Sequence, residues 1–138
     1  MNLFIMGDLN NGDLSTLPKM SVHLDDLHKK EVIDKVITFD ESGVSYLGAV
    51  WAHENDVPIV TIPDHEYEDD IRKTYGLPNR YLRRIVDKYS ADAFFFYFIP
   101  SGGKDKSVFR RNMRDFYNRS LKAFKSQRIY TNYTVPPA

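Results

Sequence analysis

Apolar and polar residues alternate along this chain in short blocks that predict strands separated by helices. The strand-like blocks are rich in β-branched and aromatic residues, which suits strands buried on both faces of a parallel sheet. Between them, apolar residues recur three and four positions apart, which is the spacing of an amphipathic helix. The expected strands cover residues 2–6, 31–39, 57–62, 91–99 and 127–133, and the expected helices cover 18–30, the segment after Gly43, 80–89 and 108–124.

The stretch 36–64 carries the clearest form of this pattern, because it runs strand, polar turn, helix, strand. Small residues such as Gly48 and Ala52 in the helical part allow that helix to approach a sheet closely. In a parallel sheet, ligands bind outside the carboxyl ends of the strands, where the next helix presents free backbone N–H groups and the positive end of its dipole. The turn 40–43 occupies that place, so we expect one βαβ unit with a ligand-facing corner there.

The whole chain suits a single α/β domain over residues 1–134, followed by an extended tail at 135–138. Its 138 residues, 42% of them hydrophobic, are enough for one core but would be crowded in two domains. We expect a mainly parallel sheet of about five strands, with helices on both faces and the strand 2–6 near its centre. The aromatic run within 91–99 is expected to be core.

The amino-acid composition limits the chemistry that this chain can perform and indicates the cellular compartment in which we expect it. The chain has no cysteine, which excludes disulfides and thiolate metal or nucleophile chemistry. The apolar run at the N-terminus is too short for a signal peptide or a membrane span. We therefore expect a soluble cytoplasmic protein with no membrane partner.

The formal net charge is zero, but the charges are unevenly distributed along the chain. Residues 1–70 carry 4 Lys and 15 Asp or Glu, whereas residues 71–138 carry 15 Lys or Arg and 4 Asp, so the two parts have formal charges of −11 and +11. One interpretation is that the two sets pair as solvated faces of one domain. Alternatively, a basic patch attracts phosphate, or an acidic face meets a basic face on another subunit.

Several polar turns follow the apolar segments, and we expect these turns to line one ligand site. Glycine turns offer backbone N–H groups to phosphate, and an arginine such as Arg80 in the first turn of a helix is not favoured there by the helix dipole. Ribose hydroxyls would be met by Asp8 or Asp40. The candidate ligand-binding residues are Gly7, Asp8, Asn10, Asn11, Ser42, Gly43, Ser45, Asp64, Arg80, Ser101, Gly102, Gly103, Lys104 and Ser107.

Two further groups of residues contain side chains that can bind metal ions, but each is explained more simply as part of a solvated surface. His23 and His28 are five residues apart, off a common helical face, and fit a solvated surface better than a metal site. The acidic run 64–70 has the oxygen ligands that Mg²⁺ requires, but such a run more often begins a solvated helix. We expect neither a metal nor a cofactor.

The run from Ser42 to Pro63 resembles the SLOG superfamily of Rossmann-like nucleotide-binding proteins, which includes the Lonely Guy phosphoribohydrolases and the DprA DNA-processing proteins. Phe39, Asp40 and Glu41 stand where the family has Gly-Gly-Ala, and Ser45 stands where it has Asp. Arg80 best matches the arginine entering a later family helix, and Ser107 lies near a family threonine in a glycine-rich segment. The positions that keep the family register are Gly43, Val44, Leu47, 51–54, 57–60 and Pro63.

The resemblance implies a Rossmann-like domain that binds a nucleotide or nucleotide-sugar at the carboxyl ends of its strands, in the manner of a sensor or sequestering protein. An alternative is an N-glycosidic-bond hydrolase or transferase, for which Glu41 or Asp40 would be the catalytic carboxylate. The Lonely Guy motif is absent, so we favour binding over catalysis. A third alternative is a ligand-free interaction protein for a host protein or nucleic acid, with nucleic acid not favoured. A dimer and a phage origin are compatible with these hypotheses.

Overall fold

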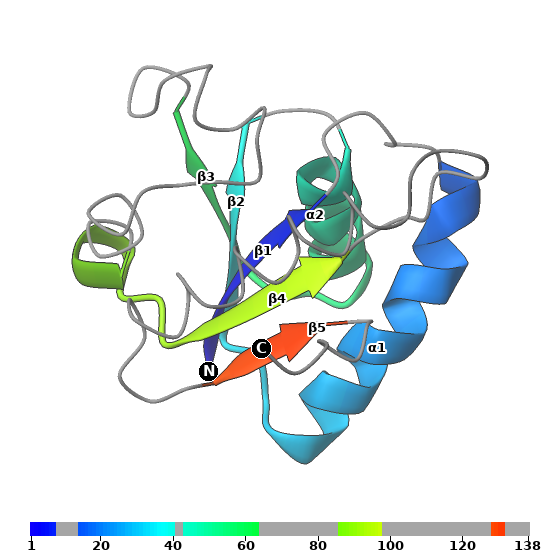
Figure 1. The fold of residues 1–138 in the computed structure, drawn as a ribbon, viewed down its shortest axis with the longest axis horizontal. Helices are drawn as coiled ribbons and strands as arrows, with labels where there is room; N and C mark the ends of the chain where they lie inside the picture. Colours follow the sequence, from blue (N-terminus) through cyan, green and yellow to red (C-terminus); the bar gives the residue numbers. More distant parts are fainter. Residues whose placement is uncertain (8–13, 41–42, 64–85, 98–127, 132–138) are drawn as a thin grey trace, which may run out of the picture.

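The computed structural model describes residues 1–7, 14–40, 43–63, 86–97 and 128–131, and these form an α/β fold built on a parallel sheet (Figure 1). Every strand pairing is parallel, and the strand order is β3-β2-β1-β4-β5. This confirms the predicted α/β class and the central place of the first strand. The strands are β1 (Asn2–Gly7), β2 (Lys35–Phe39), β3 (Ile59–Ile62), β4 (Ala93–Tyr97) and β5 (Ile129–Thr131).

The direction in which strands are added to the sheet reverses at β1. The chain places β2 and β3 on one side of β1, and then β4 and β5 on the other side. The β1 and β4 strands run in register from Leu3 opposite Ala93 to Gly7 opposite Tyr97. The carboxyl ends of these two strands are therefore level, and the reversal point lies between them.

Two helices pack on the same face of the sheet. A short 3-10 turn, η1 (Leu14–Thr16), leads into α1 (Leu17–Lys30), whose buried side chains are Met20, Leu24 and Leu27. The second helix, α2 (Val44–Glu54), lies over β1 and β2 and buries Leu47 and Trp51. The basic residues in the last turn of α1 suit the negative end of its dipole. Together with sheet residues such as Leu3, Ile5 and Phe95, these side chains form one hydrophobic cluster.

The opposite face of the sheet is also buried and is rich in aromatic side chains. Phe4 contacts Phe39 edge-on at 5.3 Å between ring centroids and Phe94 at 4.8 Å. Because side chains alternate across a strand, Phe94 and Phe96 face this side while Phe95 and Tyr97 face the helices. All four are buried, which confirms for residues 94–97 the prediction that this aromatic run is core, while Phe98 lies outside the described residues.

The strands β2, β3 and β4 begin later than the sequence predicts, and hydrogen bonds explain the difference for β2 and β3. The predicted strand 31–39 begins at Lys35, because the preceding turn instead holds the N-terminus: the Met1 ammonium donates to Val32 O at 2.7 Å. The predicted strand 57–62 begins at Ile59, because the Val57 N–H donates to Ala52 O at 2.8 Å and so closes the end of α2. The predicted helix 108–124 and the predicted tail 135–138 lie outside the described residues. Of the predicted helix 80–89, the structure describes residues 86–89, and these are helical.

Within the part of the chain that the structure describes, none of the helices combines the length and the apolar character needed to span a membrane.

Candidate functional site

The candidate site lies at the carboxyl ends of β1 and β2, where α2 begins. The two strands pair in parallel from Asn2 opposite Lys35 to Phe4 opposite Ile37, and the same register carried forward puts Gly7 level with Asp40. Gly43 then opens α2 three residues after Asp40. The structure thus brings Gly7, Asp40, Gly43 and Ser45 to one edge of the sheet, as predicted from the positions of strands and turns.

Gly43 begins α2 without a side-chain cap, so the first backbone N–H groups of the helix have no acceptor within the helix itself. Its φ of 86° and ψ of −149° belong to a region that residues with a Cβ rarely adopt, so glycine is required here. Its carbonyl accepts the Leu47 N–H at 3.2 Å, while no side chain caps the helix. The N–H groups of the first helical turn therefore have no intrahelical acceptor, and the positive end of the α2 dipole lies beside them.

Ser45 places a buried hydroxyl in this first turn. The residue is 2% exposed, and within the described ranges its Oγ is the one buried side-chain oxygen or nitrogen without a hydrogen-bond partner. Leaving a buried hydroxyl unpaired costs about 1–3 kcal/mol. A buried hydroxyl of this kind is a candidate partner for a bound ligand.

The packing of α2 on β1 indicates where that hydroxyl points. Gly48 lies against Ile5, since a Cβ added to Gly48 would be 2.9 Å from Ile5 Cγ2. On α2, Ser45 lies about one turn before Gly48, roughly 4.5 Å along the helix axis. On β1, Gly7 is the next residue after Ile5 on the same face of the sheet, roughly 6.6 Å along the strand. Because α2 runs opposite to the strands, both steps lead toward the carboxyl edge, so Ser45 faces the end of β1 near Gly7.

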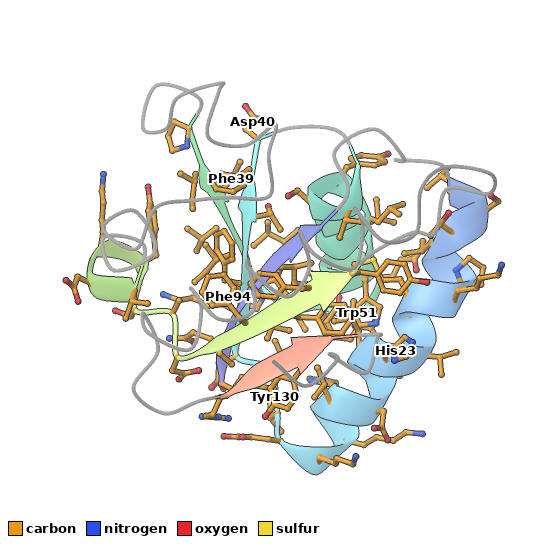
Figure 2. All side chains as sticks on the ribbon, in the orientation of Figure 1. His23, Phe39, Asp40, Trp51, Phe94 and Tyr130 are labelled. Atoms are coloured by element: carbon orange, nitrogen blue, oxygen red, sulfur yellow. The ribbon has the colours of Figure 1, made fainter. Side chains whose placement is uncertain are left out.

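Asp40 supplies a carboxylate at the same edge. Its backbone N–H donates to Ile62 O at 3.2 Å, which ties the end of β2 to the end of β3. Its side chain is exposed and directed away from the sheet (Figure 2). The carboxylate can accept hydrogen bonds from hydroxyl groups of a ligand above the strands. Among the described residues, no group of three or more histidine or acidic side chains is placed to hold a metal ion.

Tyr97 is a site residue that sequence reasoning missed. It ends β4 directly opposite Gly7, at the point where the strand order reverses. Burial raises the pKa of its phenol, which therefore keeps its proton at neutral pH and remains a hydrogen-bond donor. The ring of His23 on α1 lies 6.0 Å from the Tyr97 ring, centroid to centroid. The signal for Tyr97 was present in the sequence, as the one hydroxyl group within an otherwise apolar aromatic run, 94–98.

The surface assignment of the two histidines needs one correction. His23 is exposed, as predicted, but His28 Nδ1 accepts the Ile33 N–H at 3.0 Å. The His28 ring also meets the Trp51 ring edge-on, with 5.7 Å between centroids. His28 is therefore a structural residue that joins the end of α1 to the following turn and to α2.

The other predicted site residues lie outside the described residues. They are Asp8, Asn10, Asn11, Glu41, Ser42, Asp64, Arg80, Ser101, Gly102, Gly103, Lys104 and Ser107.

Comparison with known proteins found no match to a protein-family model, to a curated protein or to a solved structure. The functional argument therefore rests on the fold and on the residues at this edge.

Proposed function

We propose that this chain binds a nucleotide or nucleotide-sugar ligand at the carboxyl ends of its parallel strands. The observation that carries the proposal is the unpaired, buried Ser45 hydroxyl in the first turn of α2. The contact of Gly48 with Ile5 supports an orientation of this turn toward the end of β1. A phosphate oxygen at this point would accept hydrogen bonds from that hydroxyl and from the free N–H groups that follow Gly43.

The strand order supports the proposal. The order β3-β2-β1-β4-β5, with every pairing parallel, corresponds to the first five strands of the 3-2-1-4-5-6 order of doubly wound dinucleotide-binding domains. On this basis we assign the chain a Rossmann-like fold. In such sheets the ligand lies in the crevice where the strand order reverses, which here is between β1 and β4, beside Gly7 and Tyr97.

The groups at this edge also suit the two halves of a nucleotide. The start of α2 carries donors and a positive partial charge, which favour phosphate. Asp40 on the neighbouring strand is an acceptor for ribose hydroxyls, and Tyr97 is a neutral donor. SLOG membership remains a prediction from the sequence register around Gly43, and the hydrolase alternative depends on Glu41, which lies outside the described residues.

The test is ligand binding to the full chain by thermal shift and calorimetry. The panel contains AMP, ADP-ribose, NAD, cyclic mononucleotides, ribose 5-phosphate and inorganic phosphate. We expect at least one phosphorylated nucleoside to stabilise the protein by RT ln(1 + [L]/Kd). Release of free base during the incubation would instead support the hydrolase alternative.

The variant Ser45→Ala separates the proposed site from unspecific binding. Loss of one hydrogen bond to a charged phosphate is worth about 1.5–3 kcal/mol, so we expect roughly 10- to 100-fold weaker binding. Ser90→Gly is the control, because Ser90 lies at the amino edge, where its carbonyl accepts from Asn2, and its φ of 57° suits glycine. Ser90→Gly should bind the ligand as tightly as the unmodified chain. The proposal is wrong if no panel member binds, or if Ser45→Ala also binds the ligand as tightly as the unmodified chain.

A further inference from the structure

A separate cavity lies between α1 and the strands β4 and β5. Its volume is about 300 Å³, and His23 on α1 and Tyr130 on β5 mark its two sides (Figure 2). It reaches from the middle of β4 to the amino edge of the sheet, because Met1 precedes β1 and Glu31 follows α1. It is therefore distinct from the proposed nucleotide site at the carboxyl edge. The residues that line it are Met1, His23, Asp26, Leu27, Lys30, Glu31, Phe95 and Tyr130.

The inner wall of the cavity is apolar and partly aromatic. Leu27 and Phe95 line the base of the cavity, and both belong to the buried core beneath it. Tyr130 is half-buried and packs against the same cluster. The His23 ring lies 6.3 Å from the Phe95 ring, centroid to centroid. Such a wall favours a flat ring that stacks or packs edge-on against its neighbours.

The rim of the cavity carries two ion pairs. Lys30 Nζ lies 3.0 Å from Asp26 Oδ2, one helical turn away, and both side chains are mostly exposed. The Arg128 guanidinium pairs with Glu31 and so connects the start of β5 to the end of α1. Exposed pairs of this kind contribute only about 0–1 kcal/mol, so a ligand can replace one partner at small cost.

We propose that this cavity binds a small zwitterion with an aromatic ring, of the class of a free aromatic amino acid. Three charged side chains line the cavity, Asp26, Lys30 and Glu31, and Arg128 pairs with Glu31 beside it, so these four side chains comprise two acids and two bases and sum to zero. The Met1 ammonium, which also lines the cavity, pairs with Asp34. A purely cationic ligand would pair with only the acids of this rim, and a purely anionic ligand with only its bases. A zwitterion gives each released group a new partner: its ammonium meets Asp26 or Glu31, and its carboxylate meets Lys30 or Arg128.

Size and composition support the same class of ligand. A volume of about 300 Å³ lies at the lower end for small-molecule pockets, which suits a molecule with one ring system rather than a dinucleotide. The apolar wall formed by Leu27 and Phe95 would bury the ring, and the charged rim would orient the polar end. The proposal goes beyond the nucleotide site and does not depend on it.

The test is an NMR titration of the isotope-labelled full chain with L-phenylalanine and L-tryptophan. We expect saturable shifts of the Leu27, Phe95 and Tyr130 amides. L-alanine, which lacks the ring, should bind at least about tenfold more weakly, because burying a phenylalanine side chain is worth about 1.5–3 kcal/mol. Phenethylamine and 3-phenylpropionate, each lacking one charge, should bind about two- to fivefold more weakly than L-phenylalanine, as expected for exposed ion pairs.

Variants on the exposed rim keep the test independent of folding. Asp26→Asn and Lys30→Gln should each weaken L-phenylalanine binding about two- to fivefold. Lys29→Gln, which removes a neighbouring exposed charge that does not line the cavity, should leave the affinity unchanged. Three results would overturn the proposal: a Kd for both amino acids weaker than about 1 mM, equal binding of the ligands that lack one charge, or shifts confined to Gly43 and Ser45.

Discussion

Gly48 of α2 lies directly against Ile5 of β1. A Cβ added to Gly48 would be 2.9 Å from Ile5 Cγ2 and 3.2 Å from Ile5 Cβ, closer than carbon atoms normally pack. Ile5 is fully buried, so it has little room to move away. This contact sets the distance between α2 and the sheet, and with it the position of the helix start at the candidate site.

We expect Gly48→Ala to destabilise the fold even though alanine is the better helix former. Overpacking a core typically costs about 1–3 kcal/mol, whereas the gain in helix propensity is about 1 kcal/mol. The net loss in the free energy of unfolding should be up to about 2 kcal/mol, measured by urea denaturation. The double variant Gly48→Ala, Ile5→Val tests this contact, because it removes Ile5 Cδ1, which is 3.1 Å from the added Cβ. Its loss in the free energy of unfolding should be smaller than the sum of the losses of the two single variants. Strictly additive losses would contradict this account of the contact.

Asp25 should be the acidic residue of α1 that matters for stability. The Trp51 Nε1–H donates to Asp25 Oδ1 at 2.9 Å, and Trp51 is 1% exposed. Asp25→Ala leaves the indole N–H without this acceptor, so we expect a loss of about 1–2 kcal/mol in the free energy of unfolding. Asp26→Ala, one residue further on, removes an exposed carboxylate and should cost less than about 0.5 kcal/mol. Fluorescence of the single tryptophan reports both unfolding transitions, and equal losses would show that the hydrogen bond contributes nothing.

The strand and helix positions were largely predictable because the sequence signals for them are local. The β-branched run of β2 and the helical spacing of Val44, Leu47 and Trp51 each fix an element without reference to distant residues. At the start of β2, where the predicted bound was wrong, the cause lies in a distant part of the chain. The start of β2 depends on the hydrogen bond from Met1 to Val32, which joins residues 31 positions apart, and no window around Lys35 contains that information.

The candidate site was predictable in outline, because the carboxyl end of a parallel strand follows from the order of elements. Gly7, Asp40 and Gly43 were found in this way. The role of Tyr97 was not, because it depends on the pairing of β4 with β1, which joins residues ninety positions apart. The cavity beside α1 likewise requires β5 to lie next to β4, a pairing that local patterns do not specify.

Tyr97 should make stability depend on pH in alkaline solution. Burial raises its pKa above the ordinary value of 10.0, so the unfolded chain loses the phenol proton at a lower pH than the native chain does. The stability that the protonated phenol contributes is therefore fully present below about pH 10 and is lost as the pH rises through the native-state pKa. In Tyr97→Phe, the free energy of unfolding should fall less steeply above pH 10 than in the unmodified chain. Tyr46→Phe, at an exposed ring, controls for loss of a phenol, and identical slopes for Tyr97→Phe and the unmodified chain would rule out this effect.

Ser45→Ala should stabilise the protein while it weakens the ligand site. The unmodified chain carries a buried hydroxyl with no partner, at a cost of about 1–3 kcal/mol, and alanine also has the higher helix propensity. We expect the free energy of unfolding to rise by about 1 kcal/mol without ligand, measured by denaturation of the ligand-free chain. With saturating ligand the order should reverse, because the hydroxyl is then paired in the unmodified chain and the variant binds less tightly. If Ser45 served only the fold, Ser45→Ala would be less stable than the unmodified chain both without and with ligand. Opposite signs of the change in the free energy of unfolding under these two conditions therefore show that Ser45 serves ligand binding.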